Sequence, residues 1–412
     1  MRNHQLSLFD HVQAAYANSP SPLTQEALYQ QVSESAGLTD EHWQQRGKTN
    51  AGQSYNVLKR EIRWHQQTLK HAGLLEQAGK RGRWKLTKEG KAKLRKVEPK
   101  STLVAFSTEL GVALWSLCED VFDAIDAPIT LCLTSPPYPL RKQRAYGDPT
   151  DKDYVKWLVN AVRPVAERLV QGGSICLNVG NDVFEPGKPS RSLYKERLVL
   201  ALADELGLHL MDSLIWHNPT KPPSPTYWAC VNRYQLNARY EVIYWFTNDP
   251  DHVRSDNRRV LQPHSERHLK LMAKGGESNR AEFSDGAHRK RPGSFGNVTE
   301  GRIAHNIMTF PHRCKSQSDY KRMAREHGIA AHGAPYPLAL AKFLIEFLTK
   351  KGELVVDLFG GSLTTAVGCE ELERPWITTE AIWEYNRGGG LRLSPDVVRW
   401  NPEFLKIANK TA

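Results

Sequence analysis

The chain has 412 residues, of which 40% are hydrophobic and 25% charged, and its formal net charge is +11. This is an ordinary globular composition with room for two or three domains. No apolar stretch is long enough to span a membrane and the first residues lack a secretory signal, so we expect a cytoplasmic protein. Six scattered cysteines without a C-x-x-C pair argue against a metal site and against a disulfide framework.

Residues 1–98 are expected to form a separate domain. Apolar residues at helical spacing predict three helices, and a strand, a basic glycine turn and a second strand follow them. This order is typical of a winged helix. Between residues 57 and 100, 14 Lys and Arg stand against four Asp and Glu, which favours a polyanionic partner. The cations around the turn are predicted to contact DNA phosphates; they are Lys80, Arg81, Arg83 and Lys85.

From about residue 104, after a short linker, the sequence pattern changes to one typical of an α/β domain. Buried apolar runs such as "ITLCLTSPPY" and "GGSICLNVGND" alternate with amphipathic segments such as "DYVKWLVNAVRPVAERLV". This alternation predicts a mostly parallel sheet with helices on both faces. Residues 251–330 break the pattern because they are polar and rich in Arg, His, Gly and Asn. An irregular insert of this length predicts a region that reads the substrate.

A glycine-rich turn near the C-terminus predicts a nucleoside site. "VVDLFGGSLTTA" (355–366) is a strand, an acidic residue, a glycine turn and a helix start, and the next strand, "WITTE", ends in Glu380. In nucleoside-binding α/β folds, an acid at the tip of the second strand takes the ribose hydroxyls. The chain lacks both G-x-x-x-x-G-K-[ST] and G-x-G-x-x-G, which disfavours a nucleoside triphosphate and a dinucleotide. We therefore expect another adenosine-containing cofactor.

Three segments together resemble a known enzyme family. "TSPPY" (134–138), "HGAPYPLALAKFLIEFL" (332–348) and "VVDLFGGSLTTA" resemble motifs IV, X and I of the β-class DNA amino-methyltransferases, in the order of that class. The N-terminal module resembles that of Mrr-type restriction proteins. The resemblance implies a Rossmann-like α/β methyltransferase domain preceded by a small winged-helix domain. The implied divisions are a DNA-binding domain (1–98), a catalytic half (104–250), a target-recognition insert (251–330) and a cofactor-binding half (331–412).

The resemblance implies S-adenosylmethionine as the cofactor and assigns a role to individual residues. The implied cofactor-binding residues are Asp357, Phe359, Gly360, Gly361, Ser362, Glu380, His332 and Pro337. The implied catalytic residues are Ser135, Pro136, Pro137 and Tyr138. The backbone carbonyl beside Ser135 would hold the target amino group, because two prolines fix its direction, and Tyr138 would stack on a base flipped out of the duplex. Trp216 and His217 follow in a segment that fits either the core or the pocket wall.

Two positions depart from the family pattern. Leu363 stands in the glycine turn where the family usually has a small residue, and the segment before the catalytic strand has Glu109 rather than a Gly-Asp pair. Either change could weaken cofactor binding. Both leave a catalytically lapsed DNA-binding relative as an alternative.

Serine at position 135 bears on the target base. In this family S-P-P-Y is associated mostly with cytosine N4 and D-P-P-Y with adenine N6, so we expect cytosine N4, with adenine N6 as the alternative. Methylation of RNA or of a protein glutamine is a further alternative that the motif order disfavours. The resemblance implies double-stranded DNA as a partner, and with it a nucleoid-associated location, a cognate restriction endonuclease and a homodimer.

Overall fold

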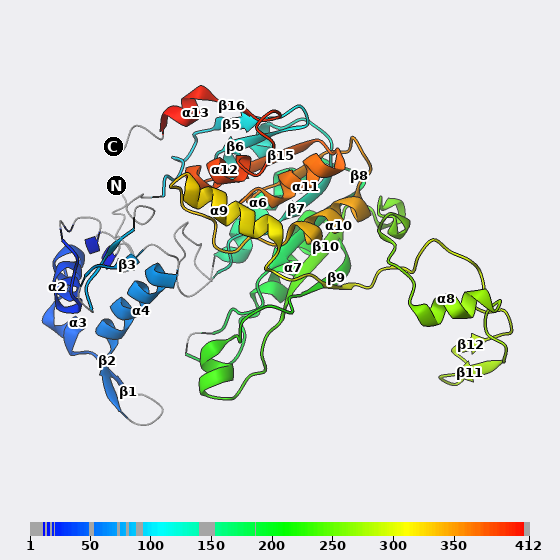
Figure 1. Ribbon diagram of the computed structural model, residues 1–412, viewed down its shortest axis with the longest axis horizontal. Helices are drawn as coiled ribbons and strands as arrows, with labels where there is room; N and C mark the ends of the chain where they lie inside the picture. Colours follow the sequence, from blue (N-terminus) through cyan, green and yellow to red (C-terminus); the bar gives the residue numbers. More distant parts are fainter. Residues whose placement is uncertain are drawn as a thin grey trace.

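The computed structural model describes residues 11–12, 15–16, 19, 21–48, 53–71, 75–79, 82–87, 94–139, 153–185 and 187–407. Within these ranges the chain forms a small N-terminal domain and a large α/β domain (Figure 1). The small domain lies on one side of the large sheet, and an extended lobe projects from the other side. Across the described residues, no helix is both long enough and apolar enough to cross a membrane.

The N-terminal domain packs helices against two short antiparallel hairpins. Its elements are α2 (Gln25–Ala36), α3 (Asp40–Gln44), β1 (Arg46–Lys48), β2 (Ser54–Asn56), α4 (Val57–His71), β3 (Leu75–Gln77) and β4 (Trp84–Leu86). Helix α2 begins where the Thr24 hydroxyl accepts the Ala27 N–H, and ends at Gly37 with φ 60°. Leu28 and Ile62 are fully buried between α2 and α4. The β3–β4 hairpin is the expected wing.

The large domain is built on one ten-stranded sheet, in the order β13-β9-β10-β8-β7-β14-β15-β6-β5-β16. Its strands are β5 (Leu103–Ser107), β6 (Gly111–Trp115), β7 (Ile129–Thr134), β8 (Leu169–Val179), β9 (His209–His217), β10 (Tyr240–Thr247), β13 (Ile307–Thr309), β14 (Val355–Asp357), β15 (Trp376–Glu380) and β16 (Arg399–Trp400). The central strands from β8 to β6 run parallel, whereas β10 and β5 pair antiparallel with their neighbours. The expected parallel α/β sheet is confirmed at its centre.

Helices cover both faces of this sheet, as Figure 1 shows. They are α6 (Tyr154–Glu167), α7 (Tyr194–Leu206), α9 (Lys315–Glu326), α10 (Leu338–Leu348), α11 (Thr364–Leu372), α12 (Trp383–Gly390) and α13 (Pro402–Lys406). Alternate residues of β7 pack into the hydrophobic cores on opposite faces of the sheet. Leu131 and Leu133 pack in the core that includes α10 and α11, and Cys132 packs in the core that includes α6 and α7. Burial on both faces explains why this strand reads as a continuous apolar run.

The irregular insert divides into a projecting part and a part that belongs to the sheet. Strand β13 pairs with β9, and Tyr320 of α9 is fully buried, so the end of the insert packs into the large domain. The preceding part of the insert projects away from the sheet and contains α8 (Glu266–Ala273), β11 (Ala281–Phe283) and β12 (His288–Lys290) (Figure 1). Reciprocal backbone hydrogen bonds between Gln262 and Arg302, 2.9 and 2.8 Å long, close the base of this part. We call residues 263–301 the insert lobe.

Candidate active site

A cavity of about 670 Å³ lies where the carboxyl ends of β7, β14 and β15 meet. In parallel sheets this edge is the usual ligand site, because the loops that leave neighbouring strands converge there. Ten of the residues predicted for catalysis or cofactor binding line the cavity: Ser135, Pro136, Pro137, Tyr138, His332, Phe359, Gly360, Gly361, Ser362 and Glu380. Segments separated by about two hundred residues of sequence are thereby brought to one cavity.

The glycine turn after β14 forms one side of the cavity. A side chain at Gly360 would meet the Thr378 hydroxyl, since its Cβ would lie 2.4 Å from Thr378 Oγ1. Gly361 has φ 53°, a conformation that favours glycine, and a Cβ there would lie 3.3 Å from the His332 ring. Gly360 therefore lets the turn pack closely on β15, and Gly361 leaves the backbone without a side chain where it faces the cavity.

Glu380 ends β15 beside this turn and is buried. Its carboxylate accepts the Gly361 N–H at 2.7 Å and the Ile382 N–H at 2.8 Å. Burial raises the pKa of Glu380 to about 7, against the lowering effect of these two backbone donors. A carboxylate in this position has lone pairs left to accept ribose hydroxyls, which fits the nucleoside prediction.

Asp357 lies behind the cavity wall and is not part of its lining. Its buried carboxylate accepts the Thr134 and Thr365 hydroxyls, each at 2.6 Å, and the Phe359 N–H at 3.1 Å. These donors come from the end of β7, from α11 and from the glycine turn. Asp357 therefore joins the two loops that carry motifs IV and I. Pro337, the residue before α10, is likewise outside the lining.

Leu363 does not crowd the cavity. It has φ 57°, and its side chain is buried in the core, pointing to Gly389 of α12. A Cβ at Gly389 would lie 2.3 Å from Leu363 Cγ, so only glycine leaves room for the leucine. A glycine on a neighbouring helix thus compensates for the missing small residue in the turn.

The TSPPY loop forms the opposite side of the cavity. Ser135 Oγ donates to the Asn178 carbonyl at 3.3 Å, and Tyr138 Oη donates to Glu241 Oε2 at 2.9 Å. The Tyr138 ring packs on Gly180, where a Cβ would lie 2.3 Å from the ring. This contact fixes the ring, and Pro136 and Pro137 fix the backbone that leads into it.

Sequence reasoning missed the polar residues that come from β8 and β10. Glu241 is half-buried, and desolvation raises its pKa while nearby Lys221 lowers it. Asn178 Nδ2 lies 3.3 Å from Glu241 Oε2, and Asn178 Oδ1 is buried without a hydrogen-bond partner among the described residues. A charged residue within an apolar strand, as in "RYEVIYWFTND", was the available signal for Glu241.

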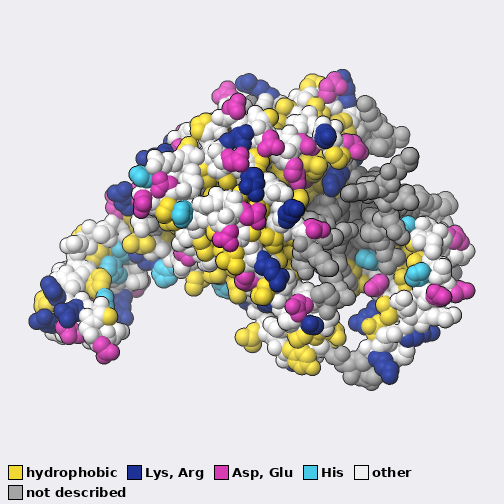
Figure 2. All heavy atoms as spheres, turned by 180° about the vertical axis from the view of Figure 1, so that it is seen from behind, with side chains coloured by type: hydrophobic (Ala, Val, Ile, Leu, Met, Phe, Trp, Pro, Cys, Tyr) yellow, Lys and Arg dark blue, Asp and Glu magenta, His cyan; other side chains and the backbone are white. Residues whose placement is uncertain are grey.

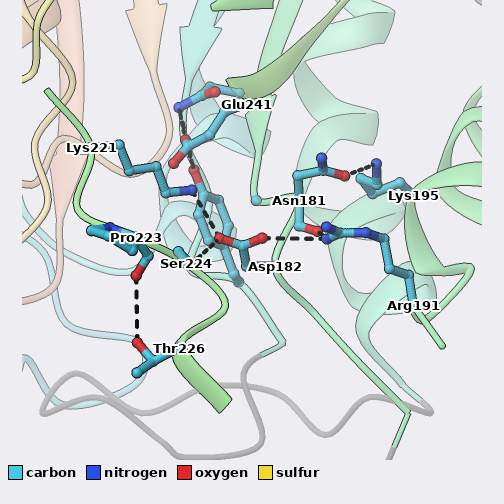
Figure 3. Close-up of polar contacts among 12 residues, drawn as sticks. Asn181, Asp182, Arg191, Lys195, Lys221, Pro223, Ser224, Thr226 and Glu241 are labelled. Atoms are coloured by element: carbon cyan, nitrogen blue, oxygen red, sulfur yellow. Dashed lines mark hydrogen bonds and ion pairs between the residues drawn. The ribbon is translucent and has the colours of Figure 1, made fainter. Parts of the chain in front are cut away.

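Asp182 anchors the loop that closes this end of the cavity. It accepts Lys221 Nζ at 2.9 Å and Ser224 Oγ at 2.8 Å, and Arg191 Nη1 lies 3.3 Å from its other oxygen (Figure 3). Lys221 itself lines the cavity. The result is a cation fixed at the cavity wall near Glu241.

The remaining predicted positions fall at different distances from the cavity. Trp216 both lines it and is buried, with Nε1 donating to the Phe310 carbonyl, whereas His217 is not in the lining. The Glu109 side chain is 84% exposed and pairs with Arg399. The acid that reaches the cavity from this segment is Glu119, which accepts Trp157 Nε1 at 2.7 Å.

The predicted DNA contacts are on the wing of the N-terminal domain, as far as they are described. Arg83 and Lys85 lie at β4, with Lys85 paired to Glu76 at 3.0 Å, and Lys80 and Arg81 lie outside the described residues. Nowhere in the described part of the chain do three or more His, Cys, Asp or Glu side chains gather as metal ligands would.

Comparison with known families finds two matches that divide the chain. Residues 129–388 match the model of the N6/N4 DNA methylases, described as "DNA methylase". Residues 9–96 match the Mrr N-terminal domain. The Mrr match ends in the linker and the methylase match begins at β7, so β5 and β6 lie between the two.

Individual proteins resemble the large domain. Type II methyltransferase M.PvuII of Proteus hauseri is 32% identical over 268 residues, which are 65% of this chain and 79% of the relative. Type II methyltransferase M.SmaI of Serratia marcescens is 25% identical over 66% of this chain and 84% of the relative. Among solved structures, PvuII DNA methyltransferase (cytosine-N4-specific) superposes with a TM-score of 0.57 at 26% identity, covering 74% of this chain and 94% of that one.

Proposed function

The chain belongs to the family of DNA amino-methyltransferases and carries an Mrr N-terminal module, and from this premise we propose that it methylates cytosine N4 in duplex DNA. The observation that carries the choice of base is Ser135, a neutral residue at the position where adenine enzymes of the family have an aspartate. The similar solved structure, whose title reads cytosine-N4-specific, supports the same choice.

S-adenosylmethionine is the methyl donor of this family, and the residues of the cavity fit it. When bound, it supplies an electrophilic methyl group on a sulfonium sulfur. We propose that Glu380 accepts its ribose hydroxyls, while the bare backbone of Gly360 and Gly361 and the ring of His332 lie against it. The evidence for this fit is the side-chain-free turn and a buried carboxylate with unused lone pairs.

The base side of the cavity supplies an acceptor for an amino group. An exocyclic amino nitrogen is a poor nucleophile because its lone pair is delocalised into the ring. The backbone carbonyl beside Ser135 is suited to accept one of its N–H groups, so that the lone pair points at the methyl carbon. Pro136 and Pro137 keep this acceptor in a fixed direction.

One amino proton must leave when the nitrogen is methylated. The nitrogen lone pair forms the new N–C bond, and the electrons of the broken C–S bond remain on sulfur. We propose Glu241 as the proton acceptor, because its carboxylate is linked through Tyr138 Oη at 2.9 Å to Ser135 Oγ 3.3 Å further on. Desolvation raises the pKa of Glu241 above its ordinary value, which makes its carboxylate a stronger base.

Two surfaces are proposed to hold the duplex while the base is flipped. The wing would contact phosphates through Arg83 and Lys85. The insert lobe would read the target sequence, and Lys and Arg side chains gather on it at one end of the molecule (Figure 2). Its exposed cations are Arg267, Lys270, Lys274, Arg280, Arg289 and Arg291.

The test is methyl transfer from labelled S-adenosylmethionine to mixed-sequence duplex DNA, followed by mass spectrometry of the nucleosides. We expect N4-methylcytosine in the product and none with Ser135→Trp, whose side chain would fill the base side of the cavity. N6-methyladenine as the product would refute the choice of base. Absence of both methylated nucleosides would refute methyl transfer to DNA by this chain.

Relatives named as Type II methyltransferases support two further proposals about partners. A restriction endonuclease that recognises the same DNA sequence would accompany this enzyme, and cleavage of unmethylated host DNA by a neighbouring gene product would test it. The enzyme is also proposed to form a homodimer, which sedimentation velocity with and without DNA measures directly.

A further inference from the structure

Residues 94–98, which join the N-terminal domain to the large domain, lie against the turn that follows Glu380. Val97 N–H donates to the Ala381 carbonyl at 2.9 Å, and Trp383 N–H donates to the Arg95 carbonyl at 2.8 Å. Lys96 and Ile382 form an antiparallel bridge between these two bonds. The linker therefore pairs with the turn as a short strand would, instead of acting as a free spacer.

An ion pair that is almost completely buried on one side fixes the linker in this place. The Glu384 side chain is 1% exposed, and its carboxylate accepts Arg95 Nε at 2.9 Å and Arg95 N–H at 3.0 Å. The same guanidinium donates to the Ile407 carbonyl at 2.9 Å and lies 3.8 Å from the centre of the Trp383 ring. A buried carboxylate depends on its partner, so neither the linker nor α12 can leave without exposing or orphaning a charge.

The turn that the linker holds carries cavity residues. The linker's partner Ala381 directly follows Glu380, and Ile382 N–H donates to Glu380 Oε1 at 2.8 Å. Ala381 and Tyr385 line the cavity, and Tyr385 lies edge-on to the His332 ring at 4.9 Å. The position of the linker and the shape of this wall are therefore set together.

The linker also contributes to the wall directly. Lys96 lines the cavity at the end formed by Glu380, Ala381 and Ser116. It is exposed, so its ammonium group has the freedom to turn toward a bound molecule. An adenosine offers acceptors that suit an ammonium donor, in its ring nitrogens and ribose oxygens.

We propose that the linker of the N-terminal module is part of the cofactor site: Lys96 contacts the adenosine of the bound cofactor, and Arg95, through Glu384, is a positioning residue for the Glu380 turn. This inference rests on the proposed placement of the cofactor against Glu380. Its consequence is that the attachment point of the DNA-binding module helps to determine cofactor affinity.

The experiment measures binding of S-adenosylhomocysteine to the full chain by titration calorimetry, together with steady-state kinetics. Lys96→Gln should weaken binding about tenfold, the loss expected for one charge-assisted hydrogen bond. Arg95→Gln should raise the KM for S-adenosylmethionine by a similar factor while kcat at saturating cofactor stays within about twofold. Lys100→Gln is the matched control, because Lys100 is an exposed lysine of the same segment outside the cavity lining.

Each outcome either supports or refutes the proposed roles of Lys96 and Arg95. Wild-type affinity in Lys96→Gln overturns the contact, and a folded Arg95→Gln with unchanged KM overturns the positioning role. If Arg95→Gln fails to fold, the surface residue Lys96 still carries the test. Glu380→Gln separates this inference from the proposed function. If both Glu380→Gln and Lys96→Gln bind S-adenosylhomocysteine normally, the cofactor lies elsewhere. If Glu380→Gln binds it more weakly while Lys96→Gln binds it normally, only the linker's role is refuted.

Discussion

Glu380 should make cofactor affinity depend on pH near neutrality. Burial raises the pKa of this group to about 7, so about nine tenths of it is ionised at pH 8 and about one tenth at pH 6. Ribose hydroxyls donate to the ionised form, and both carboxylate oxygens already accept a backbone N–H, which leaves little room for a proton. If only the ionised form binds well, affinity falls about tenfold from pH 8 to pH 6, or about 1.4 kcal/mol.

Titration calorimetry with S-adenosylhomocysteine between pH 6 and pH 8 measures this slope. Glu380→Gln is the control, because the ligand's own ionisation affects both proteins equally and only the wild type loses a charge. We expect the variant to bind more weakly at pH 8 and to show a flatter pH dependence. Equal slopes in the two proteins would refute the reasoning, since the titrating group would then belong to another residue or to the ligand.

The same shift predicts the opposite trend for the stability of the unliganded protein. A carboxyl whose pKa is higher when folded than when unfolded favours folding below its unfolded value of about 4.5, and this contribution is lost as pH rises through about 7. The difference corresponds to about 3 kcal/mol of unfolding free energy lost between pH 4.5 and pH 8. Thermal unfolding of the wild type and Glu380→Gln across this range should show that the difference in stability between the two proteins shrinks toward low pH.

Four further changes test other parts of the site. Ser135→Asp should shift the methylated nucleoside from N4-methylcytosine toward N6-methyladenine in the mass-spectrometric assay, and an unchanged product would mean that Ser135 does not select the base. Glu241→Gln should lower kcat about 10- to 100-fold with cofactor affinity unchanged, since it removes the proposed proton acceptor; a parallel loss of cofactor binding in calorimetry would contradict this. Gly389→Ala should destabilise the protein by about 2 kcal/mol in chemical denaturation, and Leu363→Gly in the same chain should recover part of it, because the new Cβ would lie 2.3 Å from Leu363 Cγ and 2.8 Å from Leu363 Cβ; additive effects would contradict the contact. Arg83→Gln should weaken DNA binding and lower the salt dependence of log K by about 0.9, the share of one phosphate contact, and an unchanged slope would argue against a DNA contact by the wing.

Local sequence patterns identified the elements that build the cavity. The apolar run before Ser135 is a strand buried on both faces, and the glycine turn after Asp357 follows a strand and opens a helix. Both predictions succeed because strand burial and turn geometry depend on neighbours in the sequence. The family followed from the same segments, since their order along the chain is itself a property of the sequence.

The roles of Asp357 and Leu363 depend on residues that are distant in sequence. Asp357 looked like a cofactor contact, yet it accepts hydroxyls from Thr134 and Thr365 behind the wall. Leu363 looked disruptive, yet Gly389 leaves room for it. Neither partner is visible in a local pattern, because the partners meet only when β7 pairs with β14 and α12 packs on α11's first turn.

The sequence by itself determined the kind of fold, the family and which loops carry the chemistry. Only the tertiary structure decided which further groups join them: Glu241 and Asn178 at the base side, and Lys96 beside Glu380. The physical reason is that periodicity and turn chemistry act over a few residues, whereas convergence on one sheet edge depends on strand order and register. Strands β7 and β14 are neighbours in the sheet although about 220 residues separate them, and β10 brings Glu241 beside the TSPPY loop through its antiparallel pairing with β8.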